Sequence, residues 1–84
     1  MSKQHQSILI LYYKPNCPFS QKVLQFLKET NQAIPLKNIA EDLSAKEELT
    51  HLGGKAQTPC LFIDGSPLYE SQAIIDYLQT HLID

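Results

Sequence analysis

The chain has 84 residues, 43% of them hydrophobic, and its seven basic and nine acidic side chains give a formal net charge of −2. This length suits one domain with one hydrophobic core, so we treat residues 1–84 as a single domain. The slight excess of acidic groups provides no basic surface for a phosphate backbone, and we expect no nucleic-acid partner.

The N-terminal region carries no sign of membrane targeting. Its longest apolar run, residues 8–13, is far shorter than the roughly 20 residues of a membrane span, and residues 1–7 lack the layout of a signal peptide. We therefore expect no membrane partner and a cytoplasmic location.

The first half of the chain predicts a strand, a helix and a second strand. Residues 7–13 form a continuous β-branched and aromatic run without polar alternation, which indicates a central strand covered on both faces. Apolar residues then recur at helical spacing from Pro18 to Asn31, with proline at a favoured first-turn position. Residues 34–39 read as a short strand, and Pro35 places it at a sheet edge because proline cannot donate a ladder hydrogen bond.

The next helix is predicted from its ends. Ser44 and Glu47 match a capping box, so the helix should begin at Ser44 and continue to about Leu52. The glycine pair at residues 53–54 should end it.

A hairpin and a closing helix complete the predicted order β-α-β-α-β-β-α. Residues 60–63 and 67–69 should pair around an Asp64-Gly65 turn, with Pro67 keeping the second strand short and at an edge. Ser71 can cap the last helix. The residues of its predicted buried stripe are Ile74, Ile75, Tyr77, Leu78 and Leu82.

Cys17 is the candidate nucleophile, because it follows the central strand and opens the first helix. As an N-cap its sulfur would face the unpaired amides of Phe19 and Ser20 and the positive end of the helix dipole, which lowers the pKa of a thiol. Lys14 could add positive charge, and Ser20 could donate its hydroxyl. The alternative is a small buried hydrophobic cysteine, against which Pro18 argues.

Three segments carry a resemblance to a known family. Residues 14–20 (KPNCPFS) resemble the active-site segment of glutaredoxins, and residues 57–65 (QTPCLFIDG) resemble the segment around their cis-proline. Residues 68–78 resemble the closing segment shared with glutathione S-transferase N-terminal domains. The resemblance covers most of residues 8–78 and implies an α/β, thioredoxin-like (glutaredoxin) fold with a four-stranded mixed sheet.

The same resemblance implies a glutathione site. It implies that Pro59 is cis and that the backbone of Thr58 pairs with the cysteinyl part of glutathione, although a trans proline at a strand start is the alternative. Glu70 and Ser71 match positions that bind the γ-glutamyl end, and a helix N-terminus suits a carboxylate. Ser71 could equally be a routine cap.

Two further residues complete the glutathione-binding set that the resemblance implies. Lys14 would face the glycyl carboxylate, unless it is simply a solvated charge. Phe19 flanks the same region, as do Tyr12 and Tyr13, but core packing explains Tyr12 as well and we assign it no role.

The implied activity is that of a glutathione-dependent disulfide oxidoreductase acting by monothiol deglutathionylation. Dithiol glutaredoxins carry a second cysteine where this chain has Ser20, and cluster-binding monothiol members typically carry glycine where it has Pro18. A 2Fe–2S cluster bound with glutathione is therefore a secondary alternative, and a glutathione-binding module without turnover is another. The expected partners are glutathione and glutathionylated proteins or small mixed disulfides. We expect the protein itself to be a monomer.

The remaining thiol and the histidines predict no second site. Cys60 lies on a core strand, and strand alternation turns its side chain from the face that Thr58 presents, so a buried inert thiol is expected and a resolving role is the alternative. His5, His51 and His81 lie far apart without metal-ligand spacing, so we expect no metal site and ordinary packing or surface roles.

Overall fold

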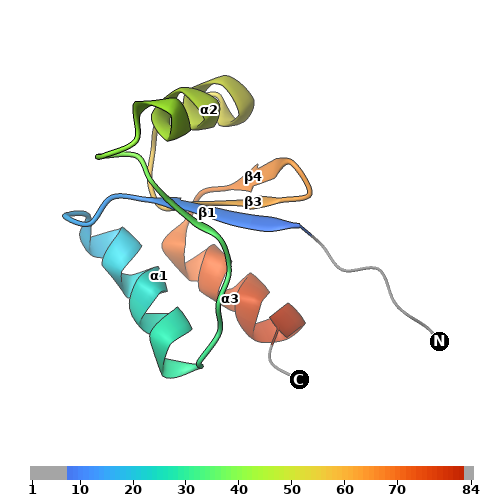
Figure 1. Ribbon diagram of the computed structural model, residues 1–84. Coiled ribbons are helices and arrows are strands. Elements are labelled where there is room, and N and C mark those ends of the chain that lie inside the picture. Colours follow the sequence, from blue (N-terminus) through green and yellow to red (C-terminus); the bar gives the residue numbers. More distant parts are fainter. Residues whose placement is uncertain (1–7, 83–84) are drawn as a thin grey trace.

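The computed structural model describes residues 8–82, in which a four-stranded mixed sheet lies between helices on its two faces (Figure 1). In chain order the elements are β1 (Leu9–Tyr13), α1 (Pro18–Glu29), β2 (Leu36–Asn38), α2 (Leu43–Gly53), β3 (Cys60–Ile63), β4 (Ser66–Leu68) and α3 (Ser71–Leu82). The strand order is β2-β1-β3-β4, with β1 parallel to β2 and the other two pairings antiparallel. The predicted element order and thioredoxin-like fold are confirmed.

Strand β1 is central and covered on both faces, as its unbroken apolar run predicts. Leu9 and Leu11 face the core cluster that packs against α1 and α3, whereas Tyr12 faces the cluster beneath α2. Figure 1 shows α1 and α3 together on one side of the sheet and α2 alone on the other. Ser7, the first residue of the predicted strand, lies outside the described residues.

Strands β2 and β4 are the two edges, as Pro35 and Pro67 predict. Strand β2 is shorter than the predicted residues 34–39, and the carbonyl of Pro35 still accepts from the Leu11 amide at 2.9 Å. Strand β4 begins at Ser66 instead of Pro67. Asp64 and Gly65 both have positive φ, 52° and 89°, so they form a two-residue turn that pairs Ile63 with Ser66.

Helix α1 ends at Glu29, two residues before the predicted Asn31. Asn31 is left-handed, with φ of 57°, and its amide donates to the Lys28 carbonyl at 3.2 Å. The amide of Gln32 donates to Leu27 at 2.9 Å. This pair of bonds is a Schellman motif, which closes the helix on its own last carbonyls.

The capping-box prediction for α2 is wrong. The helix begins at Leu43, and its cap is Asp42, whose carboxylate accepts from the amide of Ala45 at 3.2 Å. Asp42 has the extended backbone of a cap, so Ser44 and Glu47 fall inside the first turns instead of around the end. The predicted stop at the glycine pair is confirmed, because Gly54 is left-handed, with φ of 93°.

Helix α3 begins at Ser71, so this residue is its first position and not its cap. The carbonyl of Glu70 accepts the first helical hydrogen bond, from Ile74 at 2.8 Å. The predicted stripe is confirmed at Ile74, Ile75 and Leu78, which are buried, and at the partly buried Tyr77. The side chain of Leu82 lies outside the described part of the chain.

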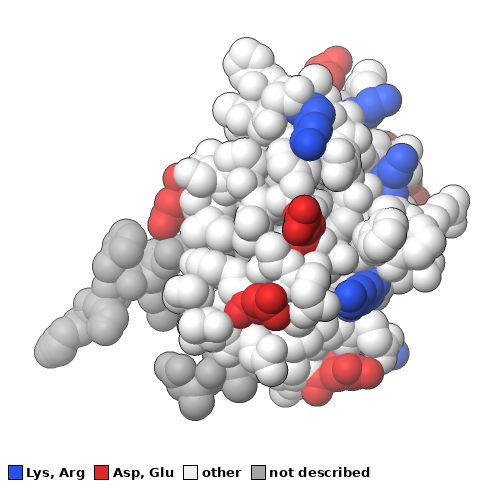
Figure 2. All heavy atoms as spheres, turned by 180° about the vertical axis from the view of Figure 1, so that it is seen from behind, with Lys and Arg blue, Asp and Glu red and all other residues white. Residues whose placement is uncertain are grey.

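The face of the molecule seen from behind carries both signs of charge (Figure 2). Blue side chains lie mainly towards its right-hand edge, and red ones are spread across the rest of the view. Among the helices of residues 8–82, none has the length and apolar character needed to cross a lipid bilayer.

Candidate active site

Cys17 is the N-cap of α1 and joins it to the end of β1. Its backbone is extended, at φ −91° and ψ 118°, and Pro18 is the first helical residue. The Cys17 amide donates to the Lys14 carbonyl at 3.1 Å, and the Cys17 carbonyl accepts from the Gln21 amide at 2.9 Å. The backbone on both sides of the sulfur is therefore held in place, and the half-buried side chain remains accessible.

The pKa of the Cys17 thiol lies below its ordinary value, although burial by itself raises it. The amide and hydroxyl of Ser20, the side chain of Thr58 and the amide of Phe19 donate towards the sulfur and outweigh the effect of burial. Helix α1 has no acidic residue in its first turn, so nothing there offsets the positive end of its dipole. The direction of this pKa shift is the one that the sequence predicts for a sulfur at the start of a helix.

Ser20 is fully buried beneath the sulfur, with 0% of its surface exposed. Its hydroxyl oxygen accepts from the Lys14 amide at 3.3 Å, which leaves the hydroxyl hydrogen free to point elsewhere. Ser20 also lowers the pKa of Cys17, through both its amide and its hydroxyl.

The peptide bond between Thr58 and Pro59 is cis, as the resemblance implies. The thiol of Cys17 donates to the carbonyl of Thr58 at 3.7 Å, so the two segments meet although 41 residues separate them in sequence. When the sulfur is ionised it no longer donates, and the Thr58 carbonyl becomes available to another donor.

Two cavities flank the contact between Cys17 and Thr58. The first, of about 540 Å³, has Cys17 in its wall and extends along the loop after β1; its other lining residues are Lys14, Pro15, Asn16, Ala40, Ala56, Gln57 and Thr58. The second, of about 410 Å³, reaches the start of α3 and is lined by Phe19, Lys22, Gln57, Thr58, Pro59, Tyr69, Glu70, Ser71 and Gln72. Because Gln57 and Thr58 belong to both walls, the two cavities adjoin along the 57–58 backbone.

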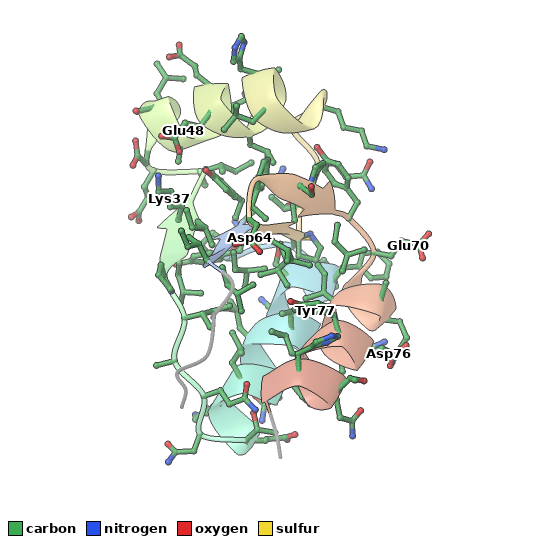
Figure 3. The ribbon with its side chains drawn as sticks, turned by 90° about the vertical axis from the view of Figure 1, so that its right-hand side faces the viewer. Lys37, Glu48, Asp64, Glu70, Asp76 and Tyr77 are labelled. Carbon is green, nitrogen blue, oxygen red and sulfur yellow. The ribbon has the colours of Figure 1, made fainter. Side chains whose placement is uncertain are left out.

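The predicted glutathione-binding residues divide between these cavities. Lys14 lies in the first, and Phe19, Pro59, Glu70 and Ser71 lie in the second. The Phe19 ring is 62% exposed at the rim. Figure 3 shows Glu70 at the outer edge of the molecule, on the other side from Lys37 and Glu48.

The sequence did not single out several residues of the second cavity. Lys22 on α1 donates to Gln72 on α3 at 3.0 Å, and this pair is formed only when the two helices pack side by side. Gln57 and Tyr69 stand directly beside predicted residues, and that adjacency was the only available signal.

Cys60 is completely buried, at 0% exposure, in the core cluster beneath α2. Burial raises the pKa of its thiol to about 11, against smaller opposite effects of the Leu68 backbone, Tyr69 and Lys55. The expectation that this thiol is buried is confirmed, and its lack of reactivity stays a prediction.

The two described histidines do not cluster with other metal-ligating side chains. No group of three or more histidine, cysteine, aspartate or glutamate side chains within residues 8–82 could bind an ion. The Nδ1 atom of His81 lies 2.9 Å from the Tyr77 carbonyl oxygen, which accepts a hydrogen bond when Nδ1 carries the proton, and the His81 ring stacks on the Tyr77 ring at 4.0 Å. His51 lies on the outer face of α2 beside Glu47, and His5 lies outside the described residues.

Comparisons with known proteins agree with this arrangement. Residues 16–81 match the family profile of the glutathione S-transferase N-terminal domain. An uncharacterized glutaredoxin-like 8.6 kDa protein in the rubredoxin operon of Clostridium pasteurianum is 32% identical over 56 residues, which cover 67% of this chain and 75% of the relative.

Two solved structures extend the similarity. A mutant of the thioredoxin-like protein BC3987 is 31% identical, with a TM-score of 0.74 over 89% of this chain and 94% of that one. A diazinon-metabolizing glutathione S-transferase of the silkworm Bombyx mori is 26% identical, with a TM-score of 0.71 over 90% of this chain but only 39% of that one. The chain therefore belongs to the glutaredoxin and glutathione S-transferase N-terminal domain family of the thioredoxin fold.

Proposed function

We propose that this domain is a glutathione-dependent thiol–disulfide oxidoreductase that removes glutathione from mixed disulfides, with Cys17 as its one nucleophile. The observation that carries the proposal is the setting of Cys17: an accessible sulfur of lowered pKa at the cap of α1, between two adjoining cavities. A thiolate is the reactive form of cysteine, so this setting favours disulfide exchange over mere packing.

The two cavities suit a short peptide that lies across Thr58. The cysteinyl part of glutathione would pair with the Thr58 backbone, whose carbonyl is released when Cys17 ionises. The γ-glutamyl end would reach Glu70 and Ser71 at the start of α3, where unpaired amides favour its carboxylate. The glycyl carboxylate would lie in the first cavity near Lys14.

In the first step the Cys17 thiolate attacks the glutathionyl sulfur of the mixed disulfide. A bond forms between Cys17 and glutathione, the original disulfide bond breaks, and the substrate leaves as a thiolate that takes a proton from water. The electron pair of the broken bond stays on the substrate sulfur, so the substrate is reduced.

In the second step a glutathione thiolate attacks the glutathionyl sulfur on Cys17. Oxidised glutathione leaves and the Cys17 thiolate returns, so the cycle consumes one glutathione and one mixed disulfide and yields one free thiol and one glutathione disulfide. The same donors that ionise Cys17 make it a good leaving group here.

The rest of the chain supports a monothiol route. Ser20 occupies the place where a second active-site cysteine would resolve the intermediate, and Cys60 is buried beneath α2. Within the described residues no other thiol is present, so glutathione itself must complete the cycle.

The test is a glutathione-coupled assay on a small mixed disulfide with wild type, Cys17→Ser and Cys60→Ala. We expect wild-type turnover, complete loss in Cys17→Ser and at least half of the activity in Cys60→Ala, which removes the thiol without burying a new polar group. Mass spectrometry should detect a Cys17–glutathione adduct in wild type. Activity that survives in Cys17→Ser, or that disappears only in Cys60→Ala, would contradict the assignment.

Two alternative functions give different results in the same preparation. A glutathione-binding module would bind glutathione without turnover. A carrier of a 2Fe–2S cluster would be coloured and contain iron after anaerobic purification; the described residues offer it one accessible thiol, Cys17, so its remaining ligands would have to come from glutathione or a second chain.

A further inference from the structure

Tyr69 joins the two sides of the second cavity. It lies between β4 and α3, directly before Glu70, and its ring packs partly buried against the core cluster beneath α2. Its hydroxyl donates to the carbonyl of Lys55 at 2.9 Å, across 14 residues of sequence. Lys55 opens the segment of residues 55–58, which connects α2 to the cis-proline and is named here the 55–58 loop.

The contact between Tyr69 and the 55–58 loop is closely fitted. The ammonium group of Lys55 lies 4.7 Å from the centre of the Tyr69 ring, so both the backbone and the side chain of Lys55 rest on it. A β-carbon at Gly53 would collide with the Tyr69 hydroxyl, so only glycine allows this approach. Burial raises the pKa of the Tyr69 hydroxyl, which therefore keeps the proton it donates.

The 55–58 loop depends on few other bonds. Among the described residues its backbone forms two hydrogen bonds with the rest of the chain: the Lys55 carbonyl accepts from Tyr69, and the Thr58 carbonyl accepts from Cys17. The second bond is lost when Cys17 ionises. In the reactive form of the domain, Tyr69 then supplies the remaining hydrogen bond to the backbone of the loop that carries Gln57 and Thr58 into both cavities, beside the contact of the Thr58 side chain with the sulfur.

We propose that Tyr69 is a positioning residue, which holds the 55–58 loop at the right distance from Cys17 and from the start of α3 and so sets the affinity for the glutathionyl group. This inference rests on the proposed function. It assigns to Tyr69 no part in the chemistry of the thiolate, because Tyr69 lines only the second cavity and Cys17 lines only the first.

The first test is Tyr69→Phe, which keeps the ring and removes the hydroxyl. The KM for a glutathionylated peptide should rise about three- to tenfold, the effect of one lost hydrogen bond, while kcat stays within about twofold. The pKa of Cys17, measured from the pH dependence of alkylation, should not move. Tyr77→Phe is the matched control, because the Tyr77 ring packs against the opposite core cluster and lines neither cavity.

The second test uses Gly53→Ala alone and together with Tyr69→Phe. In the wild-type background the added methyl group should displace the Tyr69 hydroxyl and raise KM at least as much as Tyr69→Phe does. In the Tyr69→Phe background that clash is absent, so the double variant should bind better than Gly53→Ala alone. If the losses of binding free energy in Gly53→Ala and Tyr69→Phe simply add in the double variant, a shared contact between the two residues is contradicted.

A third measurement does not depend on enzymatic activity. Trypsin cleaves after lysine, so the rate of cleavage between Lys55 and Ala56 in the folded protein reports how firmly the 55–58 loop is held. Tyr69→Phe should accelerate this cleavage several-fold, while cleavage after Lys46, within α2, stays the same and shows that the fold is intact.

The outcomes separate the two proposals. If wild type shows no glutathione-dependent turnover, the proposed function is contradicted, and with it the effect of Tyr69 on the affinity for the glutathionyl group. The rate of trypsin cleavage after Lys55 then still decides whether Tyr69 holds the 55–58 loop. An active wild type whose KM and cleavage rate are unchanged in Tyr69→Phe overturns the role of Tyr69 alone. A loss confined to kcat, or a shifted pKa of Cys17, also overturns it.

Discussion

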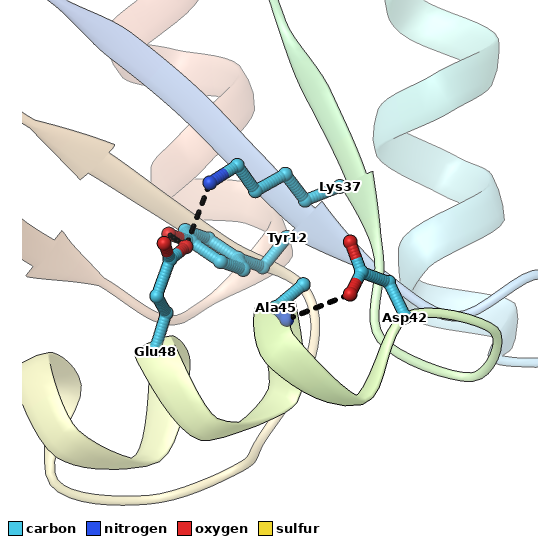
Figure 4. Close-up of polar contacts among 5 residues, drawn as sticks. All are labelled: Tyr12, Lys37, Asp42, Ala45 and Glu48. Atoms are coloured by element: carbon cyan, nitrogen blue, oxygen red, sulfur yellow. Dashed lines mark hydrogen bonds and ion pairs between the residues drawn. The ribbon is translucent and has the colours of Figure 1, made fainter.

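The hydroxyl of Tyr12, in the central strand, donates to Glu48 of α2 at 2.8 Å (Figure 4). Lys37 of the edge strand β2 donates to the same carboxylate oxygen at 2.7 Å, so one glutamate ties α2 to two strands. Hydrogen bonds to Lys37 and Tyr12 hold the pKa of Glu48 below its ordinary value, and burial raises the pKa of Tyr12. The cluster lies on the face of the sheet away from α1, and it docks α2 without lining either cavity.

Removing this link should lower stability and leave the chemistry intact. We expect Tyr12→Phe and Glu48→Gln each to reduce the free energy of unfolding by about 1 kcal/mol, since Glu48 is partly exposed and the contact is screened. Urea denaturation at neutral pH measures the loss. If the reactivity of the Cys17 thiolate fell together with the free energy of unfolding, a purely structural role of this link would be contradicted.

The same cluster predicts how stability depends on pH. Because the folded pKa of Glu48 is depressed, its contribution is complete above the unfolded value of about 4.3 and is lost as the pH falls through the lower folded value. The folded pKa of Tyr12 is raised, so its contribution is complete below the unfolded value of about 10 and is lost as the pH rises through the higher folded value. The stability difference between wild type and Glu48→Gln should therefore shrink in acid, and a difference that grew below pH 4 would contradict this assignment.

Ser20→Ala should raise the pKa of Cys17, because it removes one of the donors that stabilise the thiolate. At neutral pH less Cys17 is then ionised, so alkylation and turnover should both slow, and both should recover as the pH rises. Alkylation rates measured across pH 5–10 test this. An unchanged pKa would show that the helix amides alone ionise the sulfur.

Lys14→Gln should weaken binding of the glycyl carboxylate. For one exposed charge we expect KM to rise about two- to fivefold, with a smaller dependence on salt than in wild type and no change in kcat. Lys46→Gln on the outer face of α2 removes the same charge far from the two cavities and should leave KM unaltered. Equal effects of the two substitutions would indicate a general effect of net charge.

Asp42→Ala and Ser44→Ala distinguish the observed cap of α2 from the predicted one. Loss of the Asp42 carboxylate, which accepts from Ala45, should cost about 1 kcal/mol, whereas Ser44→Ala should stay within about 0.5 kcal/mol of wild type. Thermal and urea unfolding measure both. A larger cost for Ser44→Ala would favour the capping box.

The sequence by itself determined the element order, the central strand, both edge strands and the place of Cys17 at the start of α1. These features depend on local signals: unbroken apolar residues in 8–13, the missing amides of Pro35 and Pro67, and a cysteine directly before a helix-opening proline. Resemblance added the cis bond before Pro59. The capping-box pattern of Ser44 and Glu47 misplaced the start of α2, because Asp42, two residues earlier, is the cap in the structure.

Only the tertiary structure decided what surrounds the sulfur. The meeting of Cys17 with Thr58, the bond from Lys22 to Gln72 and the support of Lys55 by Tyr69 each join segments at least 14 residues apart. Such contacts depend on how helices pack on a sheet, and no short-range pattern encodes that packing. Local sequence could therefore predict that Cys17 lies at the start of a helix, whereas the shape of the cavities beside it follows from the folded chain as a whole.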